Sequence, residues 1–250
     1  MVPLVEQTDL AAALYAAVHT GTVGDRGFYT DVCKGGRAVL ELGCGGGRLL
    51  PVLAGVGRRV VGLDHDDALL GVARKTVEAL DLDARVRLVH GDMRTFTIER
   101  RFDRIVLAFN GLWCLPGPDA MQQALANAAR HLTPKGKLAL DVYKADAFHS
   151  EAEPDDLADD ALHPVAEVEV DGTQWLVQER SAWDPAAQRI DATYVHSAAD
   201  GRTATTTIRH HYLLRDALTT MLENAGLQVI QMTEGLANDE SLLVVCGRAD

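Results

Sequence analysis

A glycine-rich turn with an acid inside it is the feature of this chain that most directly suggests chemistry. The segment runs Glu41-Leu-Gly43-Cys-Gly45-Gly-Gly47 and overlaps the end of a short apolar stretch, 38–42. Glycines at alternate positions let a ligand approach the backbone because no Cβ stands in the way. A helical pattern follows at once, so the free N–H groups of a helix N-terminus would face the same ligand. A carboxylate at this place would repel phosphate and suit an ammonium group.

Two further acids stand at the ends of the next two apolar runs. Asp64 ends the segment 59–64, and Asp92 follows the segment 86–90. In a doubly wound sheet the carboxyl ends of the strands lie where ligands bind. Asp64 could there accept hydrogen bonds from both hydroxyls of a ribose, whereas capping of the following helix, for which Asp66 also competes, is the structural alternative. Together with the acid of the glycine turn, these two residues predict one site.

The elements that must position these acids alternate between extended and helical patterns. Apolar residues three and four positions apart predict helices over 69–80, 121–132 and 218–225. Apolar runs predict seven strands, at 38–42, 59–64, 86–90, 102–109, 138–143, 227–232 and 241–246. We therefore expect an α/β fold with a doubly wound, mostly parallel seven-stranded sheet and right-handed crossovers.

The stretch from about 165 to 212 breaks this alternation. Its pattern indicates four extended runs separated by Asp171-Gly172, Asp184-Pro185 and Asp200-Gly201. Asp-Gly between alternating runs is a strong hairpin signal, so we expect an inserted antiparallel β cap. The expected organisation is an N-terminal helical lid at 1–36, an α/β domain at 37–145 and 213–250, and an inserted loop and cap at 146–212.

Composition limits the classes of partner. The 250 residues carry 36 Asp and Glu against 24 Lys and Arg, a net charge of −12. Nucleic acids and anionic membranes attract basic surfaces, so we expect neither as a partner. No apolar run approaches the roughly 18 residues of a membrane span, and an N-terminus without a basic region predicts no signal peptide. The four scattered cysteines fit reduced thiols in the cytoplasm better than disulfides or a zinc site.

The glycine turn and the acids after it resemble motif I and the following strand ends of the class I S-adenosylmethionine-dependent methyltransferases. The resemblance is densest over 39–48, 61–64, 86–93 and 129–143. The inserted sheet is similar to that of bacterial small-molecule methyltransferases in which a sheet roofs the active site. The resemblance implies a Rossmann-like fold, S-adenosylmethionine as the cofactor, and methyl transfer to a nitrogen or oxygen of a small-molecule metabolite.

The resemblance also implies roles for individual residues that bind the cofactor. Glu41, Gly43 and Gly45 would hold the methionine end, and Asp64 the ribose. Asp92 and Met93 would contact the adenine. Tyr29, His65 and Phe109 complete the cofactor-binding set that we expect.

Candidates for substrate binding and for acid–base chemistry come from the lid, the strand ends and the cap. Family members fold an N-terminal helical segment over the cofactor, and a hydroxyl acceptor usually needs a general base within hydrogen-bond reach. We expect the substrate to contact Tyr15, Asn110, Trp113, Tyr143 and Tyr212. We expect the acid–base residues to be His19 and His210.

Two other functions stay open at this point. A nicotinamide-dependent oxidoreductase would share a glycine-rich turn and an acid about 20 residues later, but Arg48 occupies the last glycine position of the G-x-G-x-x-G fingerprint. A relative that binds S-adenosylmethionine without catalysis also stays open as a minor alternative, because methyl transfer needs no invariant catalytic side chain. We expect no metal site, since His210 and His211 are neighbours on a strand and face opposite ways. A homodimer through an edge strand of the cap is an option.

Overall fold

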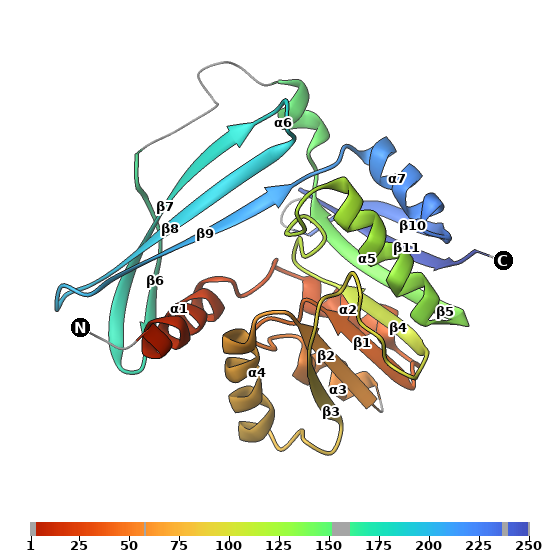
Figure 1. The fold of residues 1–250 in the computed structure, drawn as a ribbon, viewed down its shortest axis with the longest axis horizontal. Helices are drawn as coiled ribbons and strands as arrows, with labels where there is room; N and C mark the ends of the chain where they lie inside the picture. The colour runs from red at the N-terminus through yellow and green to blue at the C-terminus, as the bar shows by residue number, and fades with distance from the viewer. Residues whose placement is uncertain (1–3, 58, 152–160, 237–239, 250) are drawn as a thin grey trace.

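A seven-stranded sheet forms the centre of the molecule (Figure 1). The computed structural model describes residues 4–57, 59–151, 161–236 and 240–249. The strands of this sheet are β1 (Ala38–Leu42), β2 (Arg59–Asp64), β3 (Val86–His90), β4 (Phe102–Leu107), β5 (Leu132–Tyr143), β10 (Leu227–Gly235) and β11 (Ser241–Arg248). They lie in the order β10-β11-β5-β4-β1-β2-β3. Only β11 is antiparallel to its neighbours, β10 and β5, so the expected mostly parallel sheet is confirmed.

Helices cover both faces of this sheet. On one face, α2 (Asp25–Cys33), α3 (Leu50–Val56) and α4 (Asp67–Ala79) bury their apolar residues against the strands. On the other face, α5 (Pro118–His131) and α7 (Arg215–Asn224) do the same. The doubly wound arrangement expected from the sequence is therefore confirmed. None of the described helices is long and apolar enough to cross a membrane.

Local interactions set the start of α4. The Asp66 side chain accepts hydrogen bonds from the N–H groups of Ala68 (2.9 Å) and Leu69 (3.1 Å), which makes it the N-cap. An N-cap side chain satisfies donors that have no partner within the helix. Because Asp66 takes this role, Asp64 is free to act elsewhere.

Several strand boundaries differ from the sequence expectation, and two of them have a local cause in the backbone. The fourth strand ends at Leu107 rather than Phe109, because Phe109 and Asn110 have positive φ angles of 52° and 58° and turn the chain away. The fifth strand begins at Leu132 rather than 138, because Leu132 already pairs with Phe102 before an irregularity in the register.

The inserted region forms a separate four-stranded antiparallel sheet in the order β6-β7-β8-β9, as expected. Its strands are β6 (His163–Val170), β7 (Thr173–Asp184), β8 (Arg189–Ala198) and β9 (Thr203–His211), and α6 (Asp146–Ser150) precedes them. The N-terminal helix α1 (Leu4–Val18) lies between this cap and α4 (Figure 1). Leu14 packs there against Val170, Trp175 and Ala198 of the cap.

Candidate functional site

A cavity of about 630 Å³ lies where the glycine turn, the strand ends, α1 and β9 meet. The sequence-predicted site residues that line it are Tyr15, His19, Glu41, Gly43, Gly45, Asp64, His65, Met93 and Phe109. A second hollow, of about 590 Å³, lies between the 95–101 segment and the end of α5 and contains none of the expected residues. We therefore place the candidate site in the first cavity.

The glycine turn leaves space for a ligand at the backbone. Gly43 and Gly45 have φ angles of +72° and +51°, a region that L side chains rarely adopt. A Cβ built on Gly43 would lie 3.3 Å from the Cε of Met93, whereas one built on Gly45 would meet no atom within 4 Å. Gly45 therefore faces the open cavity, and a side chain there would occupy space that a ligand could fill.

Glu41 places a carboxylate without a partner at this wall. The residue is 3% exposed and its Oε2 has no hydrogen-bond partner. Burial raises the pKa of Glu41 to about 8, and the nearby Asp64 and Asp25 add to this effect while Arg48 opposes it. A buried acid in this condition gains most from a cation, because an unpaired buried charge is costly. The site thus fits an ammonium or sulfonium group.

Arg48 is a lining residue that the sequence interpretation missed. Its guanidinium forms an ion pair with Asp25 (2.5 Å) and lies over the ring of Phe109, 5.4 Å from the centroid. Neither terminal nitrogen makes a hydrogen bond of good geometry. In the sequence, the only hint of this role is that Arg48 directly follows Gly47, the last glycine of the turn. Glu41 and Arg48 together match the two charges of an amino-acid zwitterion.

Asp64 is held in place by the backbone. Its Oδ2 accepts the N–H of Gly45 (2.7 Å) and its Oδ1 accepts the N–H of Asp66 (2.9 Å). Burial alone would raise the pKa of Asp64, but hydrogen bonds from His65 and these two N–H groups lower it. The carboxylate is therefore fixed and ionised at the cavity wall, beside the His65 ring at 3.4 Å. A carboxylate in this state can accept hydrogen bonds from ligand hydroxyls.

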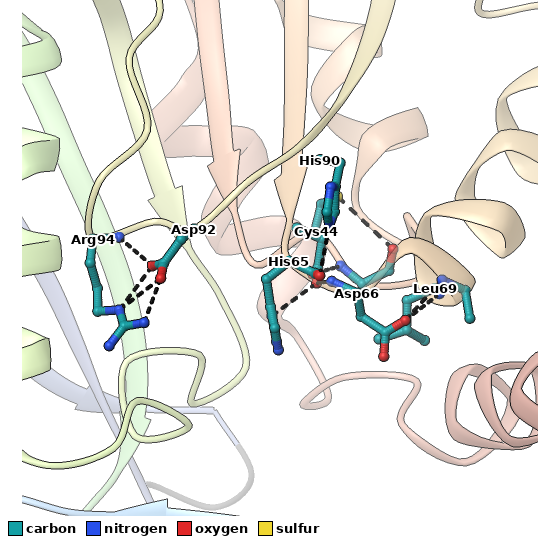
Figure 2. Close-up of polar contacts among 10 residues, drawn as sticks. Cys44, His65, Asp66, Leu69, His90, Asp92 and Arg94 are labelled. Atoms are coloured by element: carbon teal, nitrogen blue, oxygen red, sulfur yellow. Dashed lines mark hydrogen bonds and ion pairs between the residues drawn. The ribbon is translucent and has the colours of Figure 1, made fainter.

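Asp92 does not line the cavity, although Met93 does. The Asp92 carboxylate faces Arg94, to one side of His65 and Asp66 (Figure 2). It accepts the Nε of Arg94 at 2.9 and 3.0 Å, and this pairing lowers the pKa of Asp92. The side chain is 34% exposed, so a ligand contact would require exchange with Arg94.

A strained turn puts Phe109 into the cavity. Phe109 and Asn110 both have positive φ angles, each costing about 1–3 kcal/mol. Asp141, 1% exposed, holds the turn by accepting the N–H of Phe109 (2.7 Å), and it also accepts the hydroxyl of Tyr29. Asn110 accepts the N–H of Tyr143 (2.7 Å). Tyr29 and Asn110 therefore support the wall from behind and do not line the cavity.

His19 is a neutral imidazole in the cavity. Its ring centroid lies 4.4 Å from that of Tyr15, 6.2 Å from Phe109 and 4.9 Å from Tyr194 of the cap. Burial, with smaller contributions from His196 and His210, lowers the pKa of His19 to about 4. At neutral pH the ring can therefore accept a proton or a hydrogen bond.

The remaining predicted residues meet in an aromatic cluster at the base of the cap. The ring of Tyr143 lies 5.7 Å from His210, 6.5 Å from Trp113 and 6.4 Å from Tyr212. Trp113 and Tyr212 are buried, and none of these four residues lines the cavity. Burial lowers the pKa of His210 to about 4. The structure brings this set together beside the cavity and not within it.

The lining also contains Cys114 and Thr206, which the sequence interpretation did not single out. Cys114 is an exposed thiol at the cavity wall. The hydroxyl of Thr206 is buried without a hydrogen-bond partner. No periodic signal marks either residue. Within the described parts of the chain, no group of three or more His, Cys, Asp and Glu could hold a metal ion.

Comparison with known proteins agrees with this architecture. Residues 39–136 match the family described as a methyltransferase domain. The structure is similar to that of S-adenosylmethionine-bound CalS10, an amino pentose methyltransferase from Micromonospora echinaspora, with a TM-score of 0.68 and 24% identity over 90% of both chains. The chain has the class I methyltransferase fold. The glycine turn and the ends of β2 and β3 all lie within the segment that matches the methyltransferase domain.

Two curated relatives are similar to part of this chain. The cypemycin N-terminal methyltransferase of a Streptomyces species is 36% identical over 106 residues, which are 42% of each chain. The dTDP-3-amino-3,6-dideoxy-alpha-D-glucopyranose N,N-dimethyltransferase of Streptomyces fradiae is 28% identical over 163 residues, 65% of this chain. The match spans 58% of the length of the second relative. The chain therefore matches these two relatives over less than two thirds of their own length.

Proposed function

We propose that this protein transfers a methyl group from S-adenosylmethionine to a nitrogen or oxygen of a small-molecule metabolite. One observation carries the proposal: the buried, unpartnered carboxylate of Glu41 stands beside the open space at Gly45. This is a place for a cation in contact with the backbone. The match to the methyltransferase domain over 39–136 and the solved relative with S-adenosylmethionine bound support the same ligand.

Each group of lining residues would bind a different part of the cofactor. Glu41 binds the ammonium and Arg48 the carboxylate of the methionine end, close to the backbone of Gly43 and Gly45. Asp64 accepts the ribose hydroxyls, with His65 at its side. Met93 and Phe109 would hold the adenine, and Asp92 would contact it after exchange with Arg94. Tyr29 contributes by holding Asp141 and thereby the wall at Phe109.

When bound, S-adenosylmethionine supplies a methyl group that its sulfonium has already activated. The protein must therefore mainly orient the acceptor and exclude water. Tyr15 of α1 and His19, the residue that follows this helix, close the cavity, and the neutral imidazole of His19 can accept the acceptor's proton. His210 is a second candidate acid–base residue beside Tyr143. Asn110, Trp113, Tyr143 and Tyr212 lie behind the cavity lining, next to the cap, on the side where we place the substrate.

The wider setting that we propose is small-molecule metabolism in the cytoplasm, with neither nucleic acid nor membrane as a partner. The net charge of −12 supports the exclusion of nucleic acid, and four free cysteines suit a reducing compartment. We also propose a homodimer through the cap edge strand β6, which light scattering would detect as twice the mass of the chain. A single-chain mass would contradict this.

Calorimetric titration with S-adenosylmethionine, its demethylated product and NAD tests the proposal. We expect the first two to bind and NAD to give no heat of binding. Glu41→Ala should abolish the binding of the first two. Binding of NAD alone would favour the oxidoreductase instead. Turnover on amines, alcohols and thiols then separates an enzyme from a relative that only binds the cofactor.

A further inference from the structure

The underside of the cap carries a polar row beside the cavity. We define the underside as the residues of β7, β8 and β9 that share the buried face with Trp175. Across this face Glu179 pairs with Tyr194, and Tyr194 pairs with Thr206. Residues directly opposite on antiparallel strands have Cβ atoms about 4.5–5.5 Å apart. The three side chains therefore form one continuous row, which we call the cap row.

We propose that the cap row is the acceptor subsite and that it binds an aliphatic amine that also carries a hydroxyl group. This inference rests on the proposed function, since it names the substrate class of the same site. The argument uses the position of the row, its charge and its unpartnered hydroxyl.

The position of the row links it to the cavity. Thr206 lines the cavity itself. His19, which also lines it, meets the ring of Tyr194 edge-on at 4.9 Å between centroids. An acceptor that contacts His19 would therefore lie within reach of the cap row.

The charge of the row selects for a cation. On β7, β8 and β9, Glu179 is the carboxylate of the underside, and the other polar residues of that face are neutral: Ser181, Trp175, Trp183, Tyr194, Thr206, His196 and His210. Burial keeps both of these histidines neutral by lowering their pKa values. His163 of β6 pairs with Glu179 in the register, and Arg209, which also lines the cavity, is ion-paired with Asp191. Glu179 is held by Ser181, whose hydroxyl donates to its Oε1 (2.9 Å). Tyr194 is its neighbour in the register, and burial together with the charge of Glu179 raises the pKa of Tyr194. A fixed carboxylate on a neutral surface attracts an ammonium group and repels an anionic acceptor.

The unpartnered hydroxyl selects for a second polar group. The Oγ1 of Thr206 is buried and has no hydrogen-bond partner, whereas Thr207 on the opposite face bonds to Thr193 (3.1 Å). A buried hydroxyl without a partner costs free energy that a ligand hydrogen bond recovers. A hydroxyl group on the acceptor would supply that bond. An amine without one would leave Thr206 unsatisfied.

Binding of four probes to the protein saturated with S-adenosylhomocysteine tests the subsite by calorimetry. The probes are D-glucosamine, cyclohexylamine, cyclohexanol and benzoate. We expect D-glucosamine to bind best and benzoate not to bind. Glu179→Gln should lower the affinity for both amines by about 10- to 100-fold, because a charged hydrogen bond is lost. Thr206→Val should weaken D-glucosamine by about 3- to 10-fold and leave cyclohexylamine unchanged.

Matched controls come from the opposite face of the cap. Thr205 lies next to Thr206 on β9 but is exposed, and Glu167 is exposed on β6. Neither Thr205→Val nor Glu167→Gln should therefore change the affinity for any probe. Tyr194→Phe is a second test of the row, expected to weaken both amines by loosening Glu179. Thermal denaturation identifies a variant that fails to fold. If Glu179→Gln fails to fold, the amine affinities of Tyr194→Phe decide whether the cap row binds the amine.

The outcomes separate this inference from the proposed function. If S-adenosylhomocysteine does not bind, the proposed function is overturned. If it binds but neither amine does, or benzoate binds best, the cap row is not an amine subsite while the cofactor site stands. If Glu179→Gln leaves the amine affinities unchanged, the inference is equally overturned. If Thr206→Val lowered the affinities for D-glucosamine and cyclohexylamine equally, the acceptor would not need a hydroxyl group.

Discussion

The two sides of the cavity are built in different ways. On the cofactor side, Glu41, Arg48 and Asp64 lie within 24 residues of one another and are fixed by backbone turns and buried charges. On the cap side, His19 lies just after α1 and the cap row comes from three later strands, so this side depends on sheet register. The first side recognises charge at a preformed wall. The second can change its acceptor by substitutions in the cap that leave this wall intact.

The two sides also differ in how much they destabilise the folded protein without ligand. The cofactor side keeps an unpartnered carboxylate at Glu41 and a strained turn at Phe109. The cap side instead keeps His196 and His210 neutral, so it avoids buried charge on its imidazoles. Strain and unpaired charge are typical of functional sites, where ligand binding compensates for them. We therefore expect the largest ligand-dependent stabilisation to arise from the cofactor side.

Glu41→Gln should give the largest effect on cofactor affinity. The change removes a buried charge that would pair with an ammonium group, and a charged hydrogen bond contributes about 1.5–3 kcal/mol, or roughly 10- to 150-fold in Kd. Titration of S-adenosylmethionine by calorimetry measures this. Exposed Glu78→Gln on α4 is the control and should change nothing. Unliganded Glu41→Gln should melt no lower than the parent at pH 8, because it removes an unpaired buried carboxylate. An affinity within twofold of the parent would contradict the role of Glu41.

The pH dependence of binding should separate the two sides next. Because the pKa of Glu41 is raised to about 8, the group is protonated in the free protein at pH 5.5–7 and must lose its proton to pair with a cation. Affinity for S-adenosylmethionine should then rise with pH by up to about tenfold per unit. The ligand's α-amino group, with a pKa of about 7.7–8.0, stays protonated in this range.

Two controls isolate Glu41 in the pH experiment. Glu41→Gln should remove the slope, whereas His65→Asn should keep it. His65 needs this test because its hydrogen bond to Asp64 raises its pKa, so its charge is a second pH-sensitive contribution beside the cofactor site. Calorimetry in buffers of different ionisation enthalpy should show about one proton released per ligand bound. A flat affinity profile in the parent protein would show that Glu41 is already ionised without ligand.

Gly45→Ala should weaken binding by about tenfold while the fold survives. A Cβ there meets no protein atom, so it would collide with the ligand, and the positive φ adds about 1–2 kcal/mol of strain. Gly55→Ala in α3 is the matched control, since its Cβ also meets nothing. That control should leave affinity unchanged and stabilise the protein by about 0.5–1 kcal/mol. If Gly45→Ala left the affinity unchanged, the ligand would not contact the backbone at Gly45.

The same contrast explains what could be predicted from the sequence. The strand ends at Leu42 and Asp64 follow from short apolar runs and turn residues, and the structure confirms them. The four cap strands also follow from Asp-Gly turns and alternation. These are local signals, in which neighbours in the chain are neighbours in space.

Features that depend on distant segments could not be predicted. Arg48 joins the site because Asp25, 23 residues earlier, pairs with it. Thr206 joins it because β9 lies across the cavity, and its alternation with Thr205 and Thr207 distinguishes only the two faces of the strand. Tyr29 carries an aromatic signal typical of a binding residue, but its hydroxyl turns to Asp141 behind the wall. Which face of an element meets a ligand is decided by packing that periodicity does not encode.

Asp92→Asn should have the smallest effect and tests where the cofactor side ends. The Asp92 carboxylate already holds Arg94 and is 34% exposed, so a ligand contact there exchanges one partner for another. Exposed charge pairs contribute about 0–1 kcal/mol, so we expect a change in Kd of at most about fivefold. Asp67→Asn, which breaks a similar exposed pair with Arg74, is the control and should have no effect. A loss above tenfold in Asp92→Asn alone would mean that Asp92 releases Arg94 to bind the ligand, and the wall of fixed acids would then extend to the end of β3.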